Sequence, residues 1–417
     1  MRLLFVSNYF PPEVNAPATR TYEHAKQWVA DGHDVEILTA VPNFPEGEVY
    51  EGYENEFTRE TIDGIEVTRV PMYVTENSGV VKRSLSYLSF MFSAMAYCSR
   101  LRRAPDVVAA TSPQFFCAVA GLLISGLYGV PFVMEVRDLW PESIVAVGAM
   151  DRNVIIRILE WLEHLLYRRS ACIVVVTDAF KRTIRKKGIP EEKIRVLKNG
   201  IDVDAFPTDL DDEAVQTLRD EYDLEGQFVV SYIGTVGMAH RADVLFEAAR
   251  RCDRDDVVFM VVGGGSEWEV LAKKQADAQF NNFRIVEKQP KEKVPYFLEV
   301  SDVSVVHLKA SPLFETVIPS KIFESMAAGN PIVHGVRGES REIIKEAEAG
   351  IPVPPENPDA IVEAVVRLRD DDSLYEHMSQ SARNYVRAHH DRQSLAREYW
   401  DLLEEVVHSD RGVAVDP

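Results

Sequence analysis

The sequence predicts an α/β protein with two doubly wound domains, each a parallel sheet covered by helices on both faces. The chain has 417 residues, and a single hydrophobic core rarely serves more than roughly 250–300 residues. Short β-branched runs alternate with longer helical patterns, and the runs are apolar throughout, as in strands buried on both faces. The expected strands span 3–7, 35–39, 107–111, 132–136 and 172–177 in the first half, and 228–234, 257–263, 283–287, 303–308 and 331–334 in the second.

The boundary between the domains is expected near residue 205. Asn199-Gly200-Ile201-Asp202 precedes a polar, acidic stretch that runs to Gly226, and such stretches commonly separate domains. A final helix over 373–408 is long for a closing element, so part of it is expected to return to the first domain. We therefore assign a first domain, a second domain and a C-terminal helix that crosses back to the first, over residues 1–205, 206–385 and 386–417.

Composition and charge exclude several classes of protein. The net charge is −20, and residues 1–205 hold 23 basic and 26 acidic side chains, so the excess of acid lies in the second half. Because an acidic surface repels polyanions, no nucleic-acid partner is expected.

The four cysteines show neither a zinc spacing nor a disulfide framework, which fits a reducing cytoplasm. The apolar start, Met1–Ser7, runs at once into Asn8 and two prolines, so a first strand is preferred to a signal peptide. The sequence indicates no oligomeric state.

Two apolar segments raise the question of a membrane. Residues 115–134 carry no charge, but three helix breakers favour a buried helix followed by a strand over a membrane span. The run 85–98 is shorter and carries Ser86, Ser89 and Ser93 on one stripe. It lies within a longer stretch, from Glu76 to Asp106, that has no acidic residue between its two ends. Such a helix can lie in the interface of an anionic membrane; a core helix with solvated basic ends is the alternative. Its basic flanks are Lys82, Arg83, Arg100, Arg102 and Arg103, and Lys181, Arg182, Arg185, Lys186 and Lys187 would extend the positive face.

The strongest motif is the segment 318–332, I-P-S-K-I-F-E-S-M-A-A-G-N-P-I. Pro319 suits the first turn of a helix, and Gly329 suits its end. The free N–H groups at a helix start favour a phosphate, and Lys321 adds a positive charge there. Glu324 lies one turn beyond Ser320, where its carboxylate can accept two ribose hydroxyls. A capped surface helix with a solvated glutamate is the alternative.

Glycine-rich strand ends precede this helix. Gly234 and Gly237 end the first strand of the second domain, and Gly264 follows its next strand. Glycines at the carboxyl ends of parallel strands let a ligand approach the backbone, although tight turns need glycine as well. Neither loop matches G-x-G-x-x-G, which counts against a nicotinamide or flavin enzyme. Arg241 is the expected cation for a diphosphate.

Polar residues also follow two strands of the first domain. The loop F-P-P-E-V-N-A-P contains Asn15, and E-V-R-D-L-W-P-E contains Arg137, Asp138 and Glu142. A structural ion pair between Arg137 and Asp138 is the alternative to a catalytic role. The segment D-V-D at 202–204 looks like the D-x-D motif of metal-dependent transferases, but its place at the domain boundary favours a turn.

These segments resemble family 4 of the glycosyltransferases, which have the GT-B fold of two Rossmann-like domains facing across a cleft. The likeness covers nearly the whole chain and rests on F-P-P, N-G-I-D, the glycine strand ends and P-x-x-x-x-E-S-M-A-A-G-N-P-I. The segments P-N-F-P, Y-E-G-Y, E-V-R-D-L-W-P-E and I-P-S-K-I-F-E look like a bacterial subgroup making O-antigen, capsule or colanic-acid-like polysaccharides. That subgroup includes transferases resembling the N-acetylfucosamine transferase.

The resemblance implies transfer from a UDP-sugar, of the N-acetylated amino or deoxy class, to a lipid-diphosphate-linked saccharide. It implies retention of configuration, no metal or other cofactor, and a cytoplasmic enzyme at the inner membrane surface. Stabilising charge on the leaving phosphate is then the main task. The expected catalytic residues are Asp138, Arg137, Arg241 and Lys321. The expected donor-binding residues are Gly234, Gly237, Arg241, Gly264, Glu315, Thr316, Pro319, Ser320, Lys321 and Glu324, and the acceptor-binding residues are Asn15, Arg20, Asp138 and Glu142.

Three positions depart from the family pattern. Thr316 stands where many members have the first of two glutamates, and Glu315 is the nearest acid. Thr235 and His240-Arg241 replace a usual Arg and Lys pair, and Arg137 stands where many members have histidine. A UDP-sugar 2-epimerase of the same fold is one alternative, but it would need paired acids and histidines that are not found around Asp138. A non-catalytic sugar-nucleotide-binding partner of a polysaccharide assembly complex is the other, and it rests on the missing first glutamate.

Overall fold

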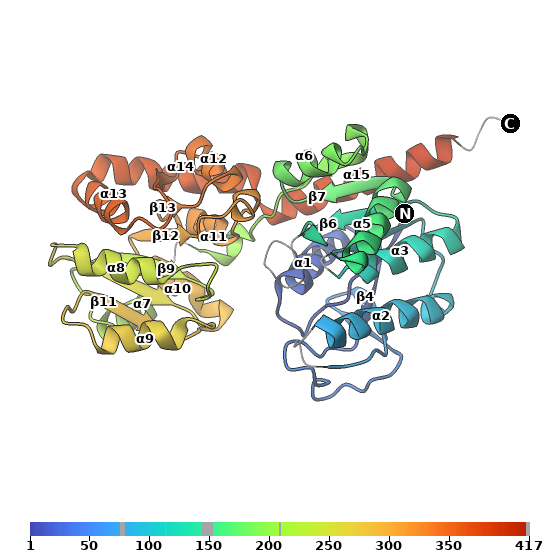
Figure 1. Cartoon of the computed structure of the whole chain (residues 1–417), viewed down its shortest axis with the longest axis horizontal. Coiled ribbons are helices and arrows are strands. Elements are labelled where there is room, and N and C mark those ends of the chain that lie inside the picture. Colours follow the sequence, from blue (N-terminus) through green and yellow to red (C-terminus); the bar gives the residue numbers. More distant parts are fainter. Residues whose placement is uncertain (76–79, 113, 143–152, 208–209, 414–417) are drawn as a thin grey trace. The chain divides into compact units, whose positions relative to one another are not determined.

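The computed structural model describes residues 1–75, 80–112, 114–142, 153–207 and 210–413. The chain forms two compact units, unit 1 of residues 1–198 with 392–417, and unit 2 of residues 199–391. Each unit is a sheet of predominantly or wholly parallel strands with helices on both faces (Figure 1). The predicted fold class is therefore confirmed.

Unit 1 is built on an eight-stranded sheet in the order β3-β4-β2-β1-β5-β6-β7-β8, parallel except for the antiparallel pair β3 and β4. Its strands are β1 Arg2–Val6, β2 Asp34–Ala40, β3 Thr58–Ile62, β4 Ile65–Val70, β5 Val107–Thr111, β6 Phe132–Val136, β7 Cys172–Val175 and β8 Ile194–Val196. Its helices are α1 Ala16–Ala30, α2 Val80–Tyr97, α3 Phe115–Tyr128, α5 Val154–Arg169, α6 Asp178–Lys186 and α15 Arg392–Val413.

Unit 2 has a six-stranded parallel sheet in the order β11-β10-β9-β12-β13-β14. Its strands are β9 Phe228–Ile233, β10 Val257–Val262, β11 Phe283–Val286, β12 Val303–His307, β13 Ile332–Gly335 and β14 Gly350–Pro352. Its helices are α7 Asp212–Glu221, α8 Asp243–Arg251, α9 Trp268–Ala276, α10 Val294–Glu299, α11 Lys321–Ala328, α12 Glu339–Glu346, α13 Pro358–Asp370 and α14 Asp372–His389. All ten expected strands are present.

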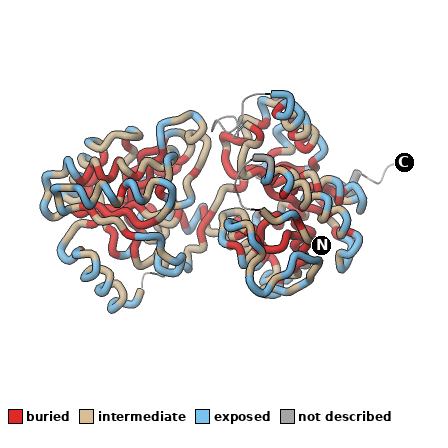
Figure 2. Tube along the Cα trace, turned by 60° about the horizontal axis from the view of Figure 1, so that its bottom comes forward, coloured by how far each residue is buried: buried red, intermediate tan, exposed pale blue. Residues whose placement is uncertain are grey.

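The sheets are buried on both faces, which explains their continuous apolar runs. In β1, Leu4 and Val6 pack with α2, α3, α5 and α6, whereas Leu3 and Phe5 pack with α1 and α15. Figure 2 shows the buried segments gathered inside each unit. Burying a side chain of this size stabilises the fold by roughly 1.5–3 kcal/mol. Residues 115–134 form α3 and the start of β6, as preferred above, and no described helix is long and apolar enough to cross a membrane.

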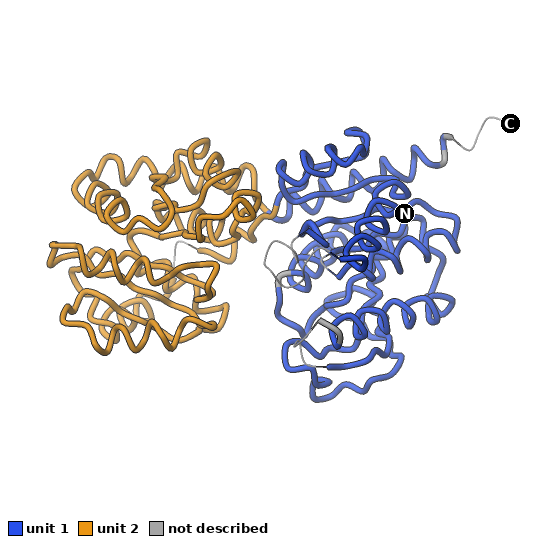
Figure 3. Tube along the Cα trace, viewed as in Figure 1, with its two compact units in different colours: residues 1–198, 392–417 blue, residues 199–391 orange. Residues whose placement is uncertain are grey.

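The C-terminal helix expected over 373–408 is two helices, so the prediction of a single helix is wrong, and the second of the two belongs to unit 1. The break lies at His390 and Asp391, where the His390 ring bonds the Asn199 carbonyl (3.0 Å) and Asp391 pairs with Ile201. Helix α14 packs on α11 in unit 2, and α15 packs on α1 in unit 1 (Figure 3). The units therefore divide after residues 198 and 391, and the boundaries predicted from the sequence, 205 and 385, differ from these by seven and six residues.

Each sheet reverses its chain order beside its first strand. Strand β1 lies between β2 and β5, and β9 lies between β10 and β12. Open parallel sheets bind ligands outside the carboxyl ends of their strands at such a point. The residues that follow β1, β5, β9 and β12 are therefore the first place to look for a site.

Candidate functional site

In unit 2, two glycine loops meet at the carboxyl ends of β9 and β10. A Cβ on Gly263 would overlap the Gly234 carbonyl oxygen, and one on Gly265 would stand 2.5 Å from the Val236 carbonyl oxygen. The Val236 N–H donates to the Gly264 carbonyl at 2.9 Å. These glycines are thus required by the packing of one loop on the other.

The Lys321 ammonium is enclosed beside these loops. Its Nζ lies 3.6 Å from the centre of the Tyr232 ring and 2.9 Å from where a Cβ on Gly234 would stand. Nζ is buried and has no hydrogen-bond partner among the described residues. Burial lowers the pKa of Lys321 to about 7, and Glu324 opposes that shift. An ammonium held by a ring face rather than by a carboxylate is available to an incoming anion.

Glu324 lies one turn beyond Lys321 on α11 and is half-buried. Burial raises the pKa of its carboxyl group, and Lys321 and Lys291 oppose the rise. The helix ends at Gly329 with φ of 79°, as expected, but it begins at Lys321. Pro319 therefore precedes the helix instead of lying in its first turn, because Ser320 is the N-cap residue. The Ser320 side chain makes no capping bond, so the helix start is not closed by it.

The expected donor residues Glu315 and Thr316 lie in the 3₁₀ turn Phe314–Thr316. The Thr316 hydroxyl donates to the Leu313 carbonyl at 2.8 Å, within its own turn. Glu315 is half-buried, and a Cβ on Gly338 would overlap its carbonyl oxygen. Its backbone thus fits closely against the start of α12.

Arg241 is neutralised by two carboxylates. Its Nε donates to Asp243 at 2.9 Å, and its Nη1 pairs with Glu356. Hydrogen bonding to Asp243, together with both carboxylate charges, raises the pKa of Arg241, while burial opposes the rise. Arg241 also has φ of 49°, a left-handed conformation that is uncommon for a residue with a Cβ. Because its guanidinium already has partners, Lys321 is the better candidate for a phosphate ligand.

His240 belongs to the candidate site, although in the sequence it stands out only as a departure from the family pattern. It is half-buried, and its Nδ1 has no hydrogen-bond partner among the described residues. Nδ1 lies 3.6 Å from where a Cβ on Gly237 would stand. Burial, followed by the charge of Lys321, lowers the pKa of His240 to about 4, so the ring is neutral at pH 7. A single histidine in a loop gives no indication in the sequence that its ring will lie near Lys321.

In unit 1, Arg137 and Asp138 follow β6, beside a buried carboxylate that we did not predict. Glu135 is 1% exposed and accepts from Arg20 Nε at 2.9 Å. Burial would raise the pKa of Glu135, but Arg20 and Arg137 hold it below its usual value. Burial also lowers the pKa of Arg137 to about 10, against the attraction of Glu135. Asp138 is half-buried at the carboxyl end of the strand.

The other expected acceptor residues have structural contacts. Arg20 is 5% exposed and directs its guanidinium to Glu135 and to the Leu197 and Lys198 carbonyls. Asn15 caps α1, with its Oδ1 accepting from Ala18 N–H at 2.9 Å. Glu142 pairs with Lys187 at 2.6 Å, and Lys187 also pairs with the buried Glu163 at 2.7 Å. These contacts within the protein explain the positions of Asn15, Arg20 and Glu142, and no bound acceptor is needed to explain them.

A polar pocket at the carboxyl ends of β1 and β2 was not predicted. It has a cavity volume of about 20 Å³, room for a water molecule at its base, and is lined in part by Asn8, Tyr9, Asn43, Arg83 and Tyr87. Asn8 is 1% exposed, and neither its Oδ1 nor its Nδ2 has a hydrogen-bond partner among the described residues. Buried amides normally have partners, so this one points to a ligand or to bound water. The only sequence signal was its place after the first strand.

Helix α2 was expected to lie on the surface, but one of its faces is buried in the core of unit 1. Phe90 and Ala94 are fully buried in the core of unit 1, and Ser86 is buried beside them. The serine stripe thus begins on the inner face, where the alternative of a core helix applies. The outer face still exposes Leu85 (52%) and Phe92 (65%).

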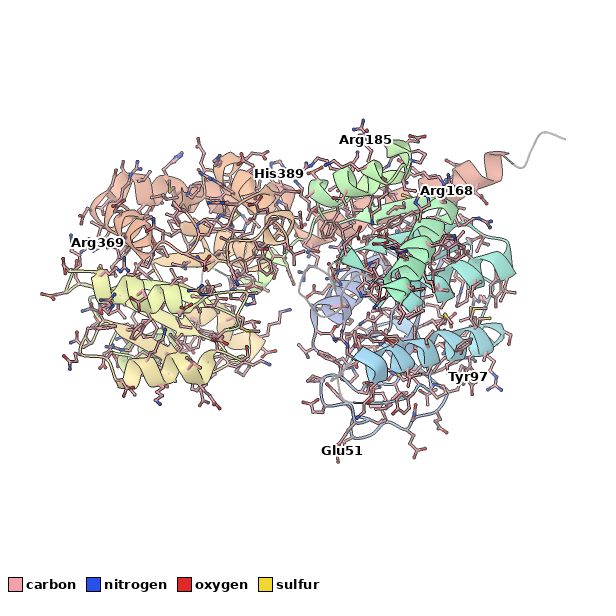
Figure 4. The ribbon with its side chains drawn as sticks, in the orientation of Figure 1. Glu51, Tyr97, Arg168, Arg185, Arg369 and His389 are labelled. Atoms are coloured by element: carbon pink, nitrogen blue, oxygen red, sulfur yellow. The ribbon has the colours of Figure 1, made fainter. Side chains whose placement is uncertain are left out.

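The basic flanks of α2 are partly used within the protein. Arg100 lies over the Tyr97 ring at 5.0 Å, and Arg102 and Arg103 pair with Glu66 and Asp34. On α6, which Figure 4 shows with Arg185 extending outward, Arg185 pairs with Glu191 at 3.1 Å. Lys187, just after that helix, pairs with Glu142 and Glu163. Lys82 and Arg83 are exposed at the start of α2.

The segment D-V-D forms a turn, as preferred. Asp202 Oδ1 accepts from Asp204 N–H at 3.2 Å at the start of the 3₁₀ turn Val203–Ala205. Among the described residues, no three or more His, Cys, Asp or Glu side chains are grouped as metal ligands.

Two family models match the chain, one after the other. The first, a glycosyl transferase 4-like domain, matches residues 15–200, and the second, glycosyl transferases group 1, matches residues 215–385. The two matches lie within the first domain and the second domain assigned from the sequence.

Relatives and solved structures agree with these models. A putative colanic acid biosynthesis glycosyl transferase of Escherichia coli is 24% identical over 96% of this chain and 98% of its own. A probable glycosyltransferase of Pseudomonas aeruginosa is 25% identical over 67% of this chain and 69% of its own. The crystal structure of Anabaena HepE in complex with UDP-glucose matches with a TM-score of 0.70 at 14% identity, over 97% of this chain and 100% of that one. Likeness at that identity shows the shared fold.

Proposed function

We propose that this chain, which belongs to the family 4 glycosyltransferases of the GT-B fold, transfers a sugar from a UDP-sugar to a lipid-diphosphate-linked saccharide. The product belongs to a bacterial surface polysaccharide, and the donor to the N-acetylated amino or deoxy sugars. Two facts support this proposal beyond the family: the relative in Escherichia coli is named for colanic acid biosynthesis, and the similar HepE structure holds UDP-glucose.

The observation that carries the donor site is the enclosed Lys321 ammonium. As the sugar leaves, negative charge grows on the β-phosphate, and a preorganised cation in a site with little water stabilises that charge strongly. Lys321 and the start of α11 supply this positive charge. Glu324 accepts hydrogen bonds from the ribose hydroxyls. The backbone lies close to the nucleotide at three glycines, Gly234, Gly237 and Gly264. Because a cation is already present, we propose that no metal is needed.

UDP release from candidate UDP-sugars, with and without a lipid-linked acceptor, tests this function. Release that depends on acceptor, persists in EDTA and gives a product with retained configuration supports it. A UDP-sugar 2-epimerase would instead interconvert donors without acceptor, and a non-catalytic partner would bind UDP and release none.

Glu324→Ala should weaken UDP binding at least tenfold and leave the fold intact. A carboxylate that hydrogen-bonds two hydroxyls contributes on the order of 1.5–3 kcal/mol, or roughly 10- to 150-fold in affinity. Titration calorimetry with UDP measures the change, and unchanged affinity would remove Glu324 from the donor site.

For the acceptor, we propose the unit 1 pocket and Asp138. The Asn8 amide has no hydrogen-bond partner within the described part of the chain, and amides beside tyrosine rings offer a saccharide both hydrogen bonds and an apolar surface. Asp138 is proposed to contact or deprotonate the acceptor hydroxyl, with Arg137 and Glu135 setting the local charge. The contacts of Asn15, Arg20 and Glu142 do not support a direct role for them.

We also propose that the outer face of α2 rests on the inner surface of the cell membrane, where a lipid-linked acceptor resides. Leu85 and Phe92 are exposed on that face, and Lys82 and Arg83 lie at its start. The lipid attraction is about 1 kcal/mol for each nearby cation. Wild type should float with anionic liposomes and lose binding in salt.

Two sets of variants separate this idea from general basicity. Lys82→Gln with Arg83→Gln, or Leu85→Ser with Phe92→Ser, should release the protein from liposomes. Arg102→Gln with Arg103→Gln is the matched control, because those arginines already pair with Glu66 and Asp34. Equal flotation of all variants, or none by the wild type, would contradict the proposal.

A further inference from the structure

His307 stands at the point where the unit 2 sheet reverses order, at the carboxyl end of β12. It is 1% exposed and lies opposite Gly335 of β13. A Cβ at that glycine would be 2.6 Å from His307 Cδ2. The imidazole ring of His307 therefore fits only because residue 335 is a glycine.

Both ring nitrogens of His307 bond to backbone, on two different loops. Nε2 accepts the Glu356 N–H at 2.8 Å, and Nδ1 lies 2.9 Å from the His240 carbonyl. Since a backbone N–H can only donate, Nε2 is the unprotonated nitrogen, and Nδ1 carries the hydrogen that it donates to His240. Burial lowers the pKa of His307, in keeping with a neutral ring.

The two loops carry the charged groups of the candidate donor site. His240 approaches Lys321 closely enough for the lysine charge to depress its pKa. Arg241 follows His240 in the chain and pairs with Glu356, whose other oxygen accepts from Ala310 N–H at 3.1 Å. Arg241 and Glu356 both have positive φ, 49° and 58°, so each needs its backbone held from outside.

We propose that His307 is a positioning residue of the donor site, whose neutral ring ties the His240 loop to the Glu356 loop and so sets the groups around Lys321. This role rests on the proposed function, because it presumes that unit 2 binds the nucleotide. His307 does not itself contact the donor. Its effect is passed on through the His240 backbone.

Two substitutions divide the role between the ring nitrogens. His307→Asn keeps an amide nitrogen near the place of Nδ1 and so can still donate to His240. His307→Gln keeps an oxygen near the place of Nε2 and can accept from Glu356, but it releases His240. By calorimetry with UDP, we expect His307→Gln to lose affinity by about tenfold, the effect of one buried hydrogen bond, and His307→Asn to lose less than about threefold.

The matched control is His334→Gln, on the neighbouring strand. His334 is also fully buried, and its ring nitrogens have no hydrogen-bond partner among the described residues. Thermal unfolding should show that all three variants fold, with His334→Gln keeping the UDP affinity of the wild type. Equal UDP affinities for the Asn and Gln variants, or the same loss in the control, would overturn the positioning role.

A double-mutant cycle with His307→Ala, which removes both ring bonds, gives an independent test should His307→Gln fold poorly. His240→Ala should weaken UDP binding by itself, and adding His307→Ala should then cost nothing further, because the group being positioned is gone. Additive losses would overturn the proposal. Failure of the wild type to bind UDP would instead remove the proposed function, and this role with it.

Discussion

Lys321→Met should lower the affinity for UDP by about a hundredfold, since a charge-assisted bond contributes on the order of 1.5–3 kcal/mol.

The same variant should be more stable than the wild type when no ligand is bound. Burial holds the pKa of Lys321 at about 7, below its ordinary 10.5, so the unfolded chain binds more protons between those values. Stability of the wild type therefore rises with pH from 7 towards 10.5, and the cost of burying the charge is fully present below 7. Methionine removes that cost, so the variant should unfold at a higher temperature at pH 7.

The pH dependence of binding gives a second measure of the same lysine. A bound diphosphate favours the ammonium, so UDP affinity should fall as the pH rises above 7 and the free enzyme loses that proton. Calorimetry in buffers of different ionisation enthalpy should show proton uptake on binding at pH 8, and none for Lys321→Met. Lys288→Met is the control, because Lys288 is exposed beside Gly264. A pH-independent affinity between pH 7 and 9 would contradict the assignment.

Asp138→Asn should lower turnover by about a hundredfold, the lower range of the effect of a positioned general base. UDP affinity should be almost unchanged, because the proposed nucleotide ligands all belong to unit 2. Steady-state kinetics with saturating donor and acceptor measure the first quantity, and calorimetry with UDP measures the second.

Two controls identify what a loss at Asp138 means. Glu142→Gln removes a carboxylate from the same segment, but one that pairs with Lys187, so it should reduce stability more than turnover. Asn8→Leu, in the unit 1 pocket, should raise the acceptor KM and leave kcat nearly unchanged. If Asp138→Asn keeps near-normal turnover, Asp138 is structural and the base lies elsewhere, with the donor phosphate the next candidate.

Local sequence was sufficient for the strands that are buried on both faces, because such strands leave continuous apolar runs. It failed for four others. Strand β3 alternates between half-buried and exposed residues, β4 carries three polar residues, and β8 and β14 have three residues each. Short or alternating strands give little periodic signal, and their existence depends on the neighbour with which they pair.

The sequence by itself determined the two-unit α/β architecture, the family, and the helix that brings Lys321 and Glu324 together, since these depend on patterns within a few turns of chain. Only the tertiary structure decided which charges are available. Arg241 meets Glu356 across 115 residues, the His240 carbonyl meets His307 across 67, and Arg20 meets Glu135 across 115. A side chain's charge is recorded in the sequence, but whether a partner neutralises it or burial shifts its pKa depends on residues that folding brings together.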